Sequence, residues 1–226
     1  MTWYSWIQLI DDLRSDDENL IFNASETISK VADKSHIADL YYLLQDASFI
    51  VREAVAIPLA RLEGVNALPA LFQALTRGFQ EGYDNDGLSA TIADLLEDHQ
   101  AAAAPVLLSM LSSADNNVRD HAAWGLGFVA SEVTADPLLL LLSDASVSVR
   151  SSAVGSLTSF ENDPRVLDVL LGALQDSSEQ VRISAASSLG YLGDQRAVEP
   201  MKTMLKRASR KYRPIVKDAL ERLGSS

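Results

Sequence analysis

The sequence repeats itself at intervals of about 31 residues. Segments that fit the pattern V-R-x-x-A-A-x-x-L-G-x-L are spaced by 31, 37, 30, 31, 32 and 31 residues. They begin at Leu20, Val51, Leu88, Val118, Val149, Val181 and Tyr212. A period of this size is typical of folds in which each unit buries its apolar side against the next unit. No other feature of the chain limits its fold as strongly.

Each segment has the apolar spacing of a helix. On a helix, positions 1, 5, 9 and 12 of the pattern fall within one arc of about 80°. The sixth segment has Val181, Ala185, Leu189 and Leu192 at these positions. Positions 6 and 10 hold small residues, such as Ala186 and Gly190, which leave room for a neighbouring backbone. We therefore predict that the segments stack on one another.

A second apolar helix is predicted before each segment. These helices are expected over residues 3–13, 36–45, 66–75, 102–111, 135–142, 166–175 and 198–205. Proline recurs near their first turn, where a missing N–H is tolerated. No strand-like alternation competes with this pattern, so we predict an all-α fold. Residues 1–226 are expected to form one domain of about seven hairpins, approximately 2–32, 34–63, 65–99, 101–130, 133–161, 164–193 and 196–224.

The run VRxxAAxxLGxLGD with an upstream Asp resembles HEAT repeats, specifically the short HEAT-like repeats of phycobilisome bilin lyases. The resemblance covers essentially the whole chain and is weakest in the first, third and seventh segments. It implies a right-handed α-solenoid of HEAT-like, armadillo-like hairpins. Because this repeat serves many unrelated roles, it implies an architecture rather than an activity.

Arginine recurs at position 2 of the pattern. These residues are Arg52, Arg119, Arg150, Arg182 and Arg213, and the preceding acids are Asp46, Asp115, Asp144 and Asp176. The rigid fork of a guanidinium suits a bridge to carboxylates and carbonyls. The resemblance to HEAT repeats favours a structural Arg/Asp ladder between units over a row of basic residues for an anionic ligand. Ser89 replaces arginine in the third segment, so we expect looser stacking there.

Positions 3, 7 and 11 lie opposite the buried stripe, and the resemblance implies that they line a concave groove. The candidate partner-binding residues are Trp124, Phe128, Tyr191, Ile183, Asp120, His121, Ile57 and Asp94. Between the aromatic residues, the fifth segment offers only serine and glycine. Large side chains beside a floor of small ones predict a docking surface. The alternative is that neighbouring repeats bury these rings.

The 37-residue spacing marks an insertion. The extra residues fall in TRGFQEGYDNDG, residues 76–87, which we expect to be a glycine-rich loop with Phe79 and Tyr83 exposed. Insertions in repeats often become binding edges, although a simply tolerated insertion explains the spacing equally well.

The charge of the chain is unevenly distributed. The net charge is −12, and residues 196–226 hold nine Lys and Arg against three acids, so residues 1–195 carry −18. This balance argues against a general nucleic-acid binder and favours a basic partner. The basic run KRASRKYR, residues 206–213, is expected to cap the solenoid rather than to bind a membrane.

No segment is expected to target or span a membrane. The longest run free of polar residues, 101–108, is too short for a bilayer, and the N-terminus lacks the pattern of a signal peptide. The chain has no cysteine. We therefore expect a cytoplasmic location.

Catalytic constellations are missing from the sequence. The iron-dependent deoxyhypusine hydroxylases resemble HEAT repeats and carry His-Glu dipeptides as metal ligands. Here His36, His99 and His121 are followed by isoleucine, glutamine and alanine. The acidic character of the expected groove also disagrees with HEAT-like DNA glycosylases, which use a basic one. We expect no catalytic residue, no metal site and no cofactor.

The sequence therefore predicts a non-enzymatic protein-interaction module. Its partner is expected to be another protein with a basic and apolar segment, not nucleic acid or membrane. Two alternatives remain open. One is a bilin lyase or phycobilisome-processing factor, which would bind an open-chain tetrapyrrole. The other is an immunity-type inhibitor of a basic protein.

Overall fold

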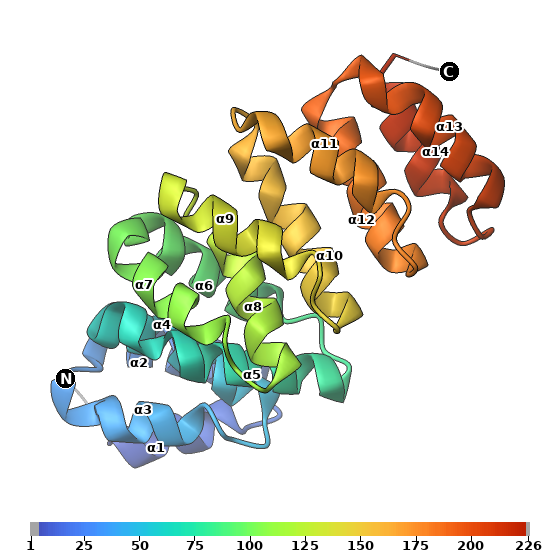
Figure 1. Cartoon of the computed structure of the whole chain (residues 1–226). Helices are drawn as coiled ribbons and strands as arrows, with labels where there is room; N and C mark the ends of the chain where they lie inside the picture. The colour runs from blue at the N-terminus through green and yellow to red at the C-terminus, as the bar shows by residue number, and fades with distance from the viewer. Residues whose placement is uncertain (1–4, 225–226) are drawn as a thin grey trace. The chain divides into compact units, whose positions relative to one another are not determined.

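The computed structural model describes residues 5–224, and every regular element within that range is a helix (Figure 1). The α-helices are α1 (Trp6–Leu13), α2 (Glu18–Val31), α3 (Ile37–Leu43), α4 (Phe49–Glu63), α5 (Leu68–Glu81), α6 (Asp86–Asp98), α7 (Gln100–Met110), α8 (Asn116–Leu126), α9 (Glu132–Leu141), α10 (Val147–Ser156), α11 (Pro164–Ala173), α12 (Glu179–Leu192), α13 (Val198–Arg207) and α14 (Arg213–Arg222). The predicted all-α fold is confirmed.

The helices follow one another as pairs, as the repeat predicts. The even-numbered helices from α2 to α14 carry the repeated segments, and the odd-numbered helices precede them. The first predicted helix, residues 3–13, is observed from Trp6 onward, while Trp3 lies outside the described residues. Short turns close the pairs, as at Gly193, whose φ of +75° suits glycine.

The chain divides into two compact units, residues 1–106 and 107–226, and the division falls within α7. In unit 1, α4 packs between α2 and α6. In unit 2, α8, α10, α12 and α14 pack in that order. The single domain expected over residues 1–226 stays a prediction.

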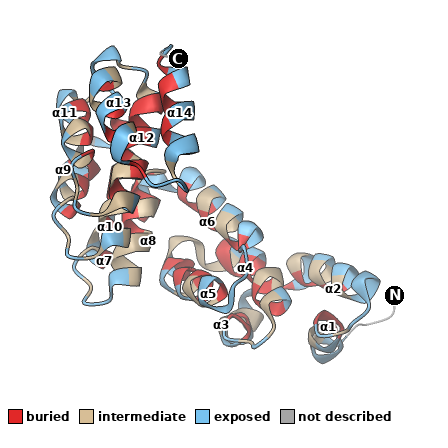
Figure 2. Cartoon of the chain, turned by 90° about the vertical axis from the view of Figure 1, so that its right-hand side faces the viewer, coloured by how far each residue is buried: buried red, intermediate tan, exposed pale blue. Residues whose placement is uncertain are grey.

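The core of each unit lies where the helices face one another (Figure 2). In α12 most of the predicted stripe is inside: Val181, Ala185 and Leu189 are buried, and Leu192 is half-buried. A methyl group added at Gly190 would lie 2.7 Å from Cβ of Ala219 on α14. The small residue at position 10 therefore permits a close approach of two helices, as predicted.

Most of the insertion is helical, which corrects our expectation of a loop over residues 76–87; only residues 82–85 lie between α5 and α6. Helix α5 continues to Glu81 and ends at Gly82, with φ of +87°. Asn85 is buried in the left-handed region, with φ of +58°. A Cβ on Gly78 would lie 1.7 Å from its Oδ1, so Gly78 makes room for this side chain instead of loosening the backbone. Tyr83 is exposed, as expected, and stacks on Phe49 with centroids 4.5 Å apart.

Helices α4 and α5, taken together as the stretch Phe49–Glu81, are long and apolar enough to span a membrane by length and composition alone. In the structure it is interrupted at Gly64, whose φ is +55°, between α4 and α5. Val55, Leu59 and Leu71 on these two helices are buried within unit 1. This is the arrangement of core helices in a hairpin repeat.

Candidate functional site

Arg119 and Arg150 form two equivalent rungs of the Arg/Asp ladder in unit 2. Nη1 of Arg150 donates to the carbonyl oxygens of Asp144 and Ala145 at 2.8 and 3.3 Å. Its Nε and Nη2 donate to the carboxylate of Asp176 at 2.9 and 3.0 Å. Arg119 binds the Asp144 carboxylate in the same way, at 2.8 and 2.9 Å. Each guanidinium thus joins its own loop to the loop of the next repeat, and holds the pKa of that aspartate below its ordinary value.

In unit 1 the ladder residues Arg52 and Asp46 form ion pairs with residues outside the repeated pattern. Arg52 is only 1% exposed, and its Nη1 donates to the carbonyl oxygen of Asp46 at 2.8 Å. Its Nη2 pairs with Glu81, which ends the lengthened helix α5. The carboxylate of Asp46 pairs with Arg14 at the C-cap of α1. These ion pairs tie successive loops together, so their role is structural.

Asp115 differs from the expected ladder. It lies four residues before Arg119 and caps α8 by accepting the N–H of Asn117 at 2.8 Å. Ser113, six residues before Arg119, holds the rung position and supplies its carbonyl oxygen at 2.8 Å. The difference was visible in the sequence, because Asp46, Asp144 and Asp176 lie six residues before their arginines and Asp115 only four.

The last two arginines keep only part of the rung. Nη1 of Arg182 donates to the carbonyl oxygens of Asp176 and Ser177 at 2.7 and 3.0 Å. Nε of Arg213 donates to the carbonyl oxygen of Ala208 at 3.1 Å. Within the described residues, neither guanidinium has a carboxylate partner.

The outer sides of α8, α10 and α12 form what we call the α8–α10–α12 face. Its members are Asp120, Trp124, Phe128, Ser151, Ser152, Gly155, Ser159, Ser187 and Tyr191. The half-buried rings of Trp124 and Phe128 meet edge to face, with centroids 4.9 Å apart. Tyr191 is 70% exposed. Because α10 packs between α8 and α12, an aromatic pair and an exposed tyrosine border a strip of small residues.

Hydroxyl groups on this strip are bonded within the protein. Ser152 donates to the carboxylate of Asp120, and the hydroxyl oxygens of Ser151 and Ser184 lie 2.6 Å apart. Gly155 is exposed, and a Cβ there would meet nothing within 4 Å. The strip is therefore an open surface on which the hydroxyls of Ser151 and Ser152 already have partners.

Two predicted members of the surface are placed differently. Ile183 is 7% exposed and belongs to the core of unit 2, so it offers no surface to a partner. Packing with neighbouring helices, which one sequence segment does not reveal, decides its burial. His121 is half-buried, and this burial lowers the pKa of its imidazole, so the ring is neutral at pH 7.

Unit 1 carries the remaining predicted residues. Ile57 on α4 is 53% exposed, and Asp94 on α6 is exposed. Glu53 is half-buried, and its carboxylate accepts the backbone N–H of Leu88 at 3.2 Å. Burial raises the pKa of Glu53. This acid therefore links α4 to α6 rather than serving a binding surface.

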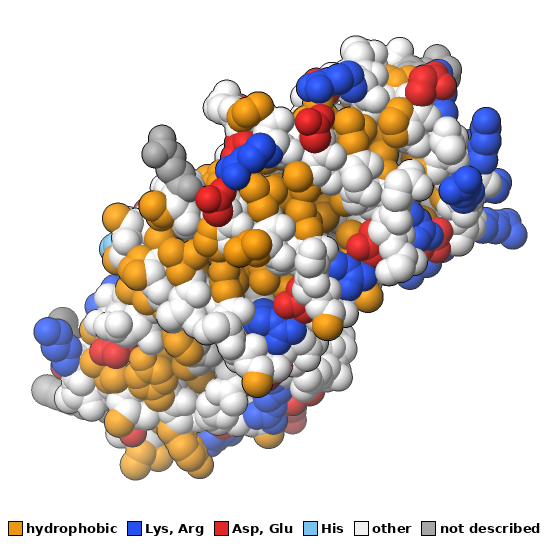
Figure 3. Space-filling model, viewed as in Figure 1, with side chains coloured by type: hydrophobic (Ala, Val, Ile, Leu, Met, Phe, Trp, Pro, Cys, Tyr) orange, Lys and Arg blue, Asp and Glu red, His pale blue; other side chains and the backbone are white. Residues whose placement is uncertain are grey.

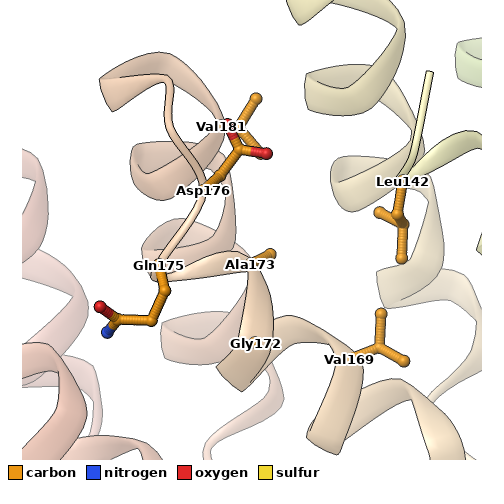
Figure 4. A pocket seen from close by; sticks show the side chains of 7 residues that line it. All are labelled: Leu142, Val169, Gly172, Ala173, Gln175, Asp176 and Val181. Atoms are coloured by element: carbon orange, nitrogen blue, oxygen red, sulfur yellow. The ribbon is translucent and has the colours of Figure 1, made fainter. Parts of the chain in front are cut away.

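Unit 2 also contains cavities on the side of the ladder loops. One of about 270 Å³ is lined by residues that include Leu142 and Val169, whose side chains point toward one another (Figure 4). Another, of about 280 Å³, is lined in part by Arg182 and Arg207. This second cavity was not predicted from the sequence, although Arg207, six residues before Arg213, was a visible signal. Across residues 5–224, no three His, Cys, Asp or Glu side chains are placed to hold a metal ion.

Comparison with known proteins gives a family and a set of distant structures. A family model for HEAT repeats matches residues 80–157 and 135–221, which together span more than half of the chain. No curated protein matches the sequence.

Three solved structures illustrate the structural similarity. The Escherichia coli protein YibA is 18% identical over 98% of this chain and 93% of its own, with a TM-score of 0.48. A designed armadillo repeat protein in complex with the peptide (KR)4 is 19% identical over 96% and 98%, with a TM-score of 0.46. The complex of CpcE and CpcF of phycocyanin lyase from Nostoc sp. matches at 19% identity over 96% and 94%, with a TM-score of 0.43.

Proposed function

Because the chain belongs to the HEAT-repeat family, we propose that it acts as a non-enzymatic protein-binding module. The α8–α10–α12 face would hold a segment of a protein partner. The observation that carries this proposal is the exposure of Tyr191, a residue 70% accessible on the same face as Trp124 and Phe128. Aromatic side chains of this kind dominate the energetics of protein interfaces.

The face is preorganised for binding. Its residues are held on helices that pack in order, and the hydroxyls of Ser151 and Ser152 are bonded to neighbouring groups. A partner's apolar side chain could therefore settle over Gly155 without leaving the hydroxyls of Ser151 and Ser152 unpaired. Since the helices are already in place, little conformational entropy is lost on docking.

The chemistry of the partner follows from charge. Asp120 lies on the face beside the aromatic pair, and residues 1–195 carry a net charge of −18. Such a field steers cationic partners and raises their association rate. The proposed partner segment therefore combines an apolar anchor with Lys or Arg.

The test compares two tyrosine substitutions. Partners captured from the native host by the wild-type protein would be identified, purified and titrated by isothermal calorimetry. We expect Tyr191→Ala to weaken binding about tenfold or more, as for a central aromatic residue in an interface. Tyr42→Ala is the matched control, because Tyr42 is 75% exposed but lies on α3 in unit 1. Equal affinity of the Tyr191→Ala variant and the wild type would refute the proposed surface.

The bilin alternative makes a different use of the same rings. Trp124, Phe128 and Tyr191 offer aromatic surface to a flat conjugated ligand. Adding an open-chain tetrapyrrole would then shift its absorbance spectrum, and Tyr191→Ala would reduce the shift. An immunity-type inhibitor would instead bind one basic protein tightly in a one-to-one complex, which the same calorimetry measures.

A further inference from the structure

The rungs of unit 2 use the arginine fork in a fixed way. Nη1 takes the two loop carbonyls that precede the helix, and Nε with Nη2 take the carboxylate of the next loop. The aspartate oxygens lie 2.8 to 3.0 Å from the nitrogens of Arg119 and Arg150. The second half of the fork is thus a two-point carboxylate site that the chain itself normally fills.

Arg182 keeps the bonds from Nη1 to the loop carbonyls but lacks those from Nε and Nη2 to a carboxylate. The residue six positions before the repeat arginine is Asp144 in one repeat and Asp176 in the next, but Arg207 in the last. Nη1 of Arg182 is bound to loop carbonyls, whereas its Nε and Nη2 have no hydrogen-bond partner among the described residues. Because Arg207 stands where the preceding repeats have an aspartate, no loop aspartate binds the Nε and Nη2 of Arg182. We call this arrangement the open rung.

A cavity of about 280 Å³ lies at this open rung. It is lined by Arg182 from α12, by Thr203, Met204 and Arg207 from α13, and by Leu174, Gln175 and Asp176, which follow α11. Arg207 is exposed and makes no hydrogen bond or ion pair with any residue in the described range. Two guanidinium groups thus line one space, and the one acid among its lining residues is Asp176.

The nearby acids are already engaged. The carboxylate of Asp176 is held by Arg150 and by the N–H of Ser178, at 2.7 Å. The carboxylate of Glu179 accepts the N–H of Ser209 at 2.6 Å. Lys and Arg side chains gather over α13 and α14, where residues 196–226 carry a net charge of +6 (Figure 3). The local field therefore favours an anion from outside the chain.

We propose that the cavity between Arg182 and Arg207 binds a carboxylate of a polypeptide partner, an Asp or Glu side chain, in the place that a loop aspartate takes in the preceding rungs. Asp144 and Asp176 supply the precedent, since both fit the same nitrogen pair with two parallel hydrogen bonds. This site is separate from the α8–α10–α12 face and selects the opposite charge. It does not depend on the proposed function.

The experiment uses the full chain and a peptide of the chain's own loop. The probe is residues 142–147, Leu-Ser-Asp-Ala-Ser-Val, with both ends blocked, and a second peptide has Asn in place of Asp. Binding is followed by chemical-shift changes in the wild-type protein. We expect the Asp peptide to bind at least about tenfold more tightly than the Asn peptide, because a charge-assisted pair of hydrogen bonds is lost.

The decisive variant is Arg207→Asp, which restores the usual residue of the rung. It should close the site by pairing with Arg182, weaken peptide binding at least about tenfold and raise Tm. Arg210→Asp is the matched control, since it changes the charge equally at an exposed position that does not line the cavity. That control should weaken binding less than about threefold, through screened charge alone.

Three results would overturn the proposal. They are equal weakening by Arg207→Asp and Arg210→Asp, no binding of the Asp peptide at millimolar concentration, and inorganic phosphate binding more tightly than the peptide. The last would assign the cavity to phosphate. Tyr191→Ala should leave peptide binding unchanged, so failure here and failure of the proposed function are distinguishable.

Discussion

Replacing Gly190 by alanine tests the closest contact between two repeats. A Cβ at Gly190 would lie 2.7 Å from Cβ and 2.8 Å from Cα of Ala219, and 3.1 Å from its carbonyl oxygen. Carbon atoms pack comfortably at about 3.5–4.0 Å, so α12 and α14 would have to separate by about 1 Å. Because the obstructing atoms include backbone, a side-chain rotation cannot relieve the overlap.

The magnitude is a difference between two opposing effects. Overpacking of this kind costs up to about 3 kcal/mol. Alanine gains about 1 kcal/mol over glycine inside a helix. The expected net destabilisation is therefore about 2 kcal/mol, which lowers the Tm of a chain of this size by roughly 4–8 °C.

Gly155→Ala is the matched control on α10. A Cβ at Gly155 meets nothing within 4 Å, so only the helix-propensity gain remains. That variant should be stabilised by about 0.5–1 kcal/mol. Both are measured by circular dichroism during thermal and urea unfolding. If Gly190→Ala stabilises the chain as Gly155→Ala does, the close approach of α12 to α14 is refuted.

Two predictions concern titratable groups. Hydrogen bonds from Arg150 hold the pKa of Asp176 below its ordinary value, so this ion pair stabilises the fold above about pH 4 and is lost as pH falls through the lowered pKa. Asp176→Asn should lower the free energy of unfolding by roughly 2 kcal/mol at pH 7 and flatten the acid side of a plot of Tm against pH. An unchanged slope would contradict the ladder. Burial raises the pKa of Glu53, so the charged form is disfavoured in the fold and stability rises as pH falls through the raised pKa. Glu53→Gln, which can still accept the Leu88 N–H, should have a higher Tm than the wild type at pH 7 and the same Tm near pH 4; a lower Tm at pH 7 would contradict this account.

The sequence alone determined the repeating architecture. In the sixth segment, positions 1, 5, 9 and 10 face neighbouring helices, so the burial of Val181, Ala185, Leu189 and Gly190 could be read from the period. The arginines of the ladder were equally visible, because a contact between neighbouring repeats recurs at a nearly constant separation in sequence. Both features depend only on contacts between repeats that are neighbours in the sequence.

Only the tertiary structure decided what happens at positions where the repeats differ. The burial of Ile183 and the helical insertion held by Gly78 depend on the side chains of adjacent elements. The open fork of Arg182 likewise follows from a change in the next repeat, at Arg207. A residue's own pattern position sets its direction from the helix axis, but the neighbouring helix sets whether that direction meets protein or water.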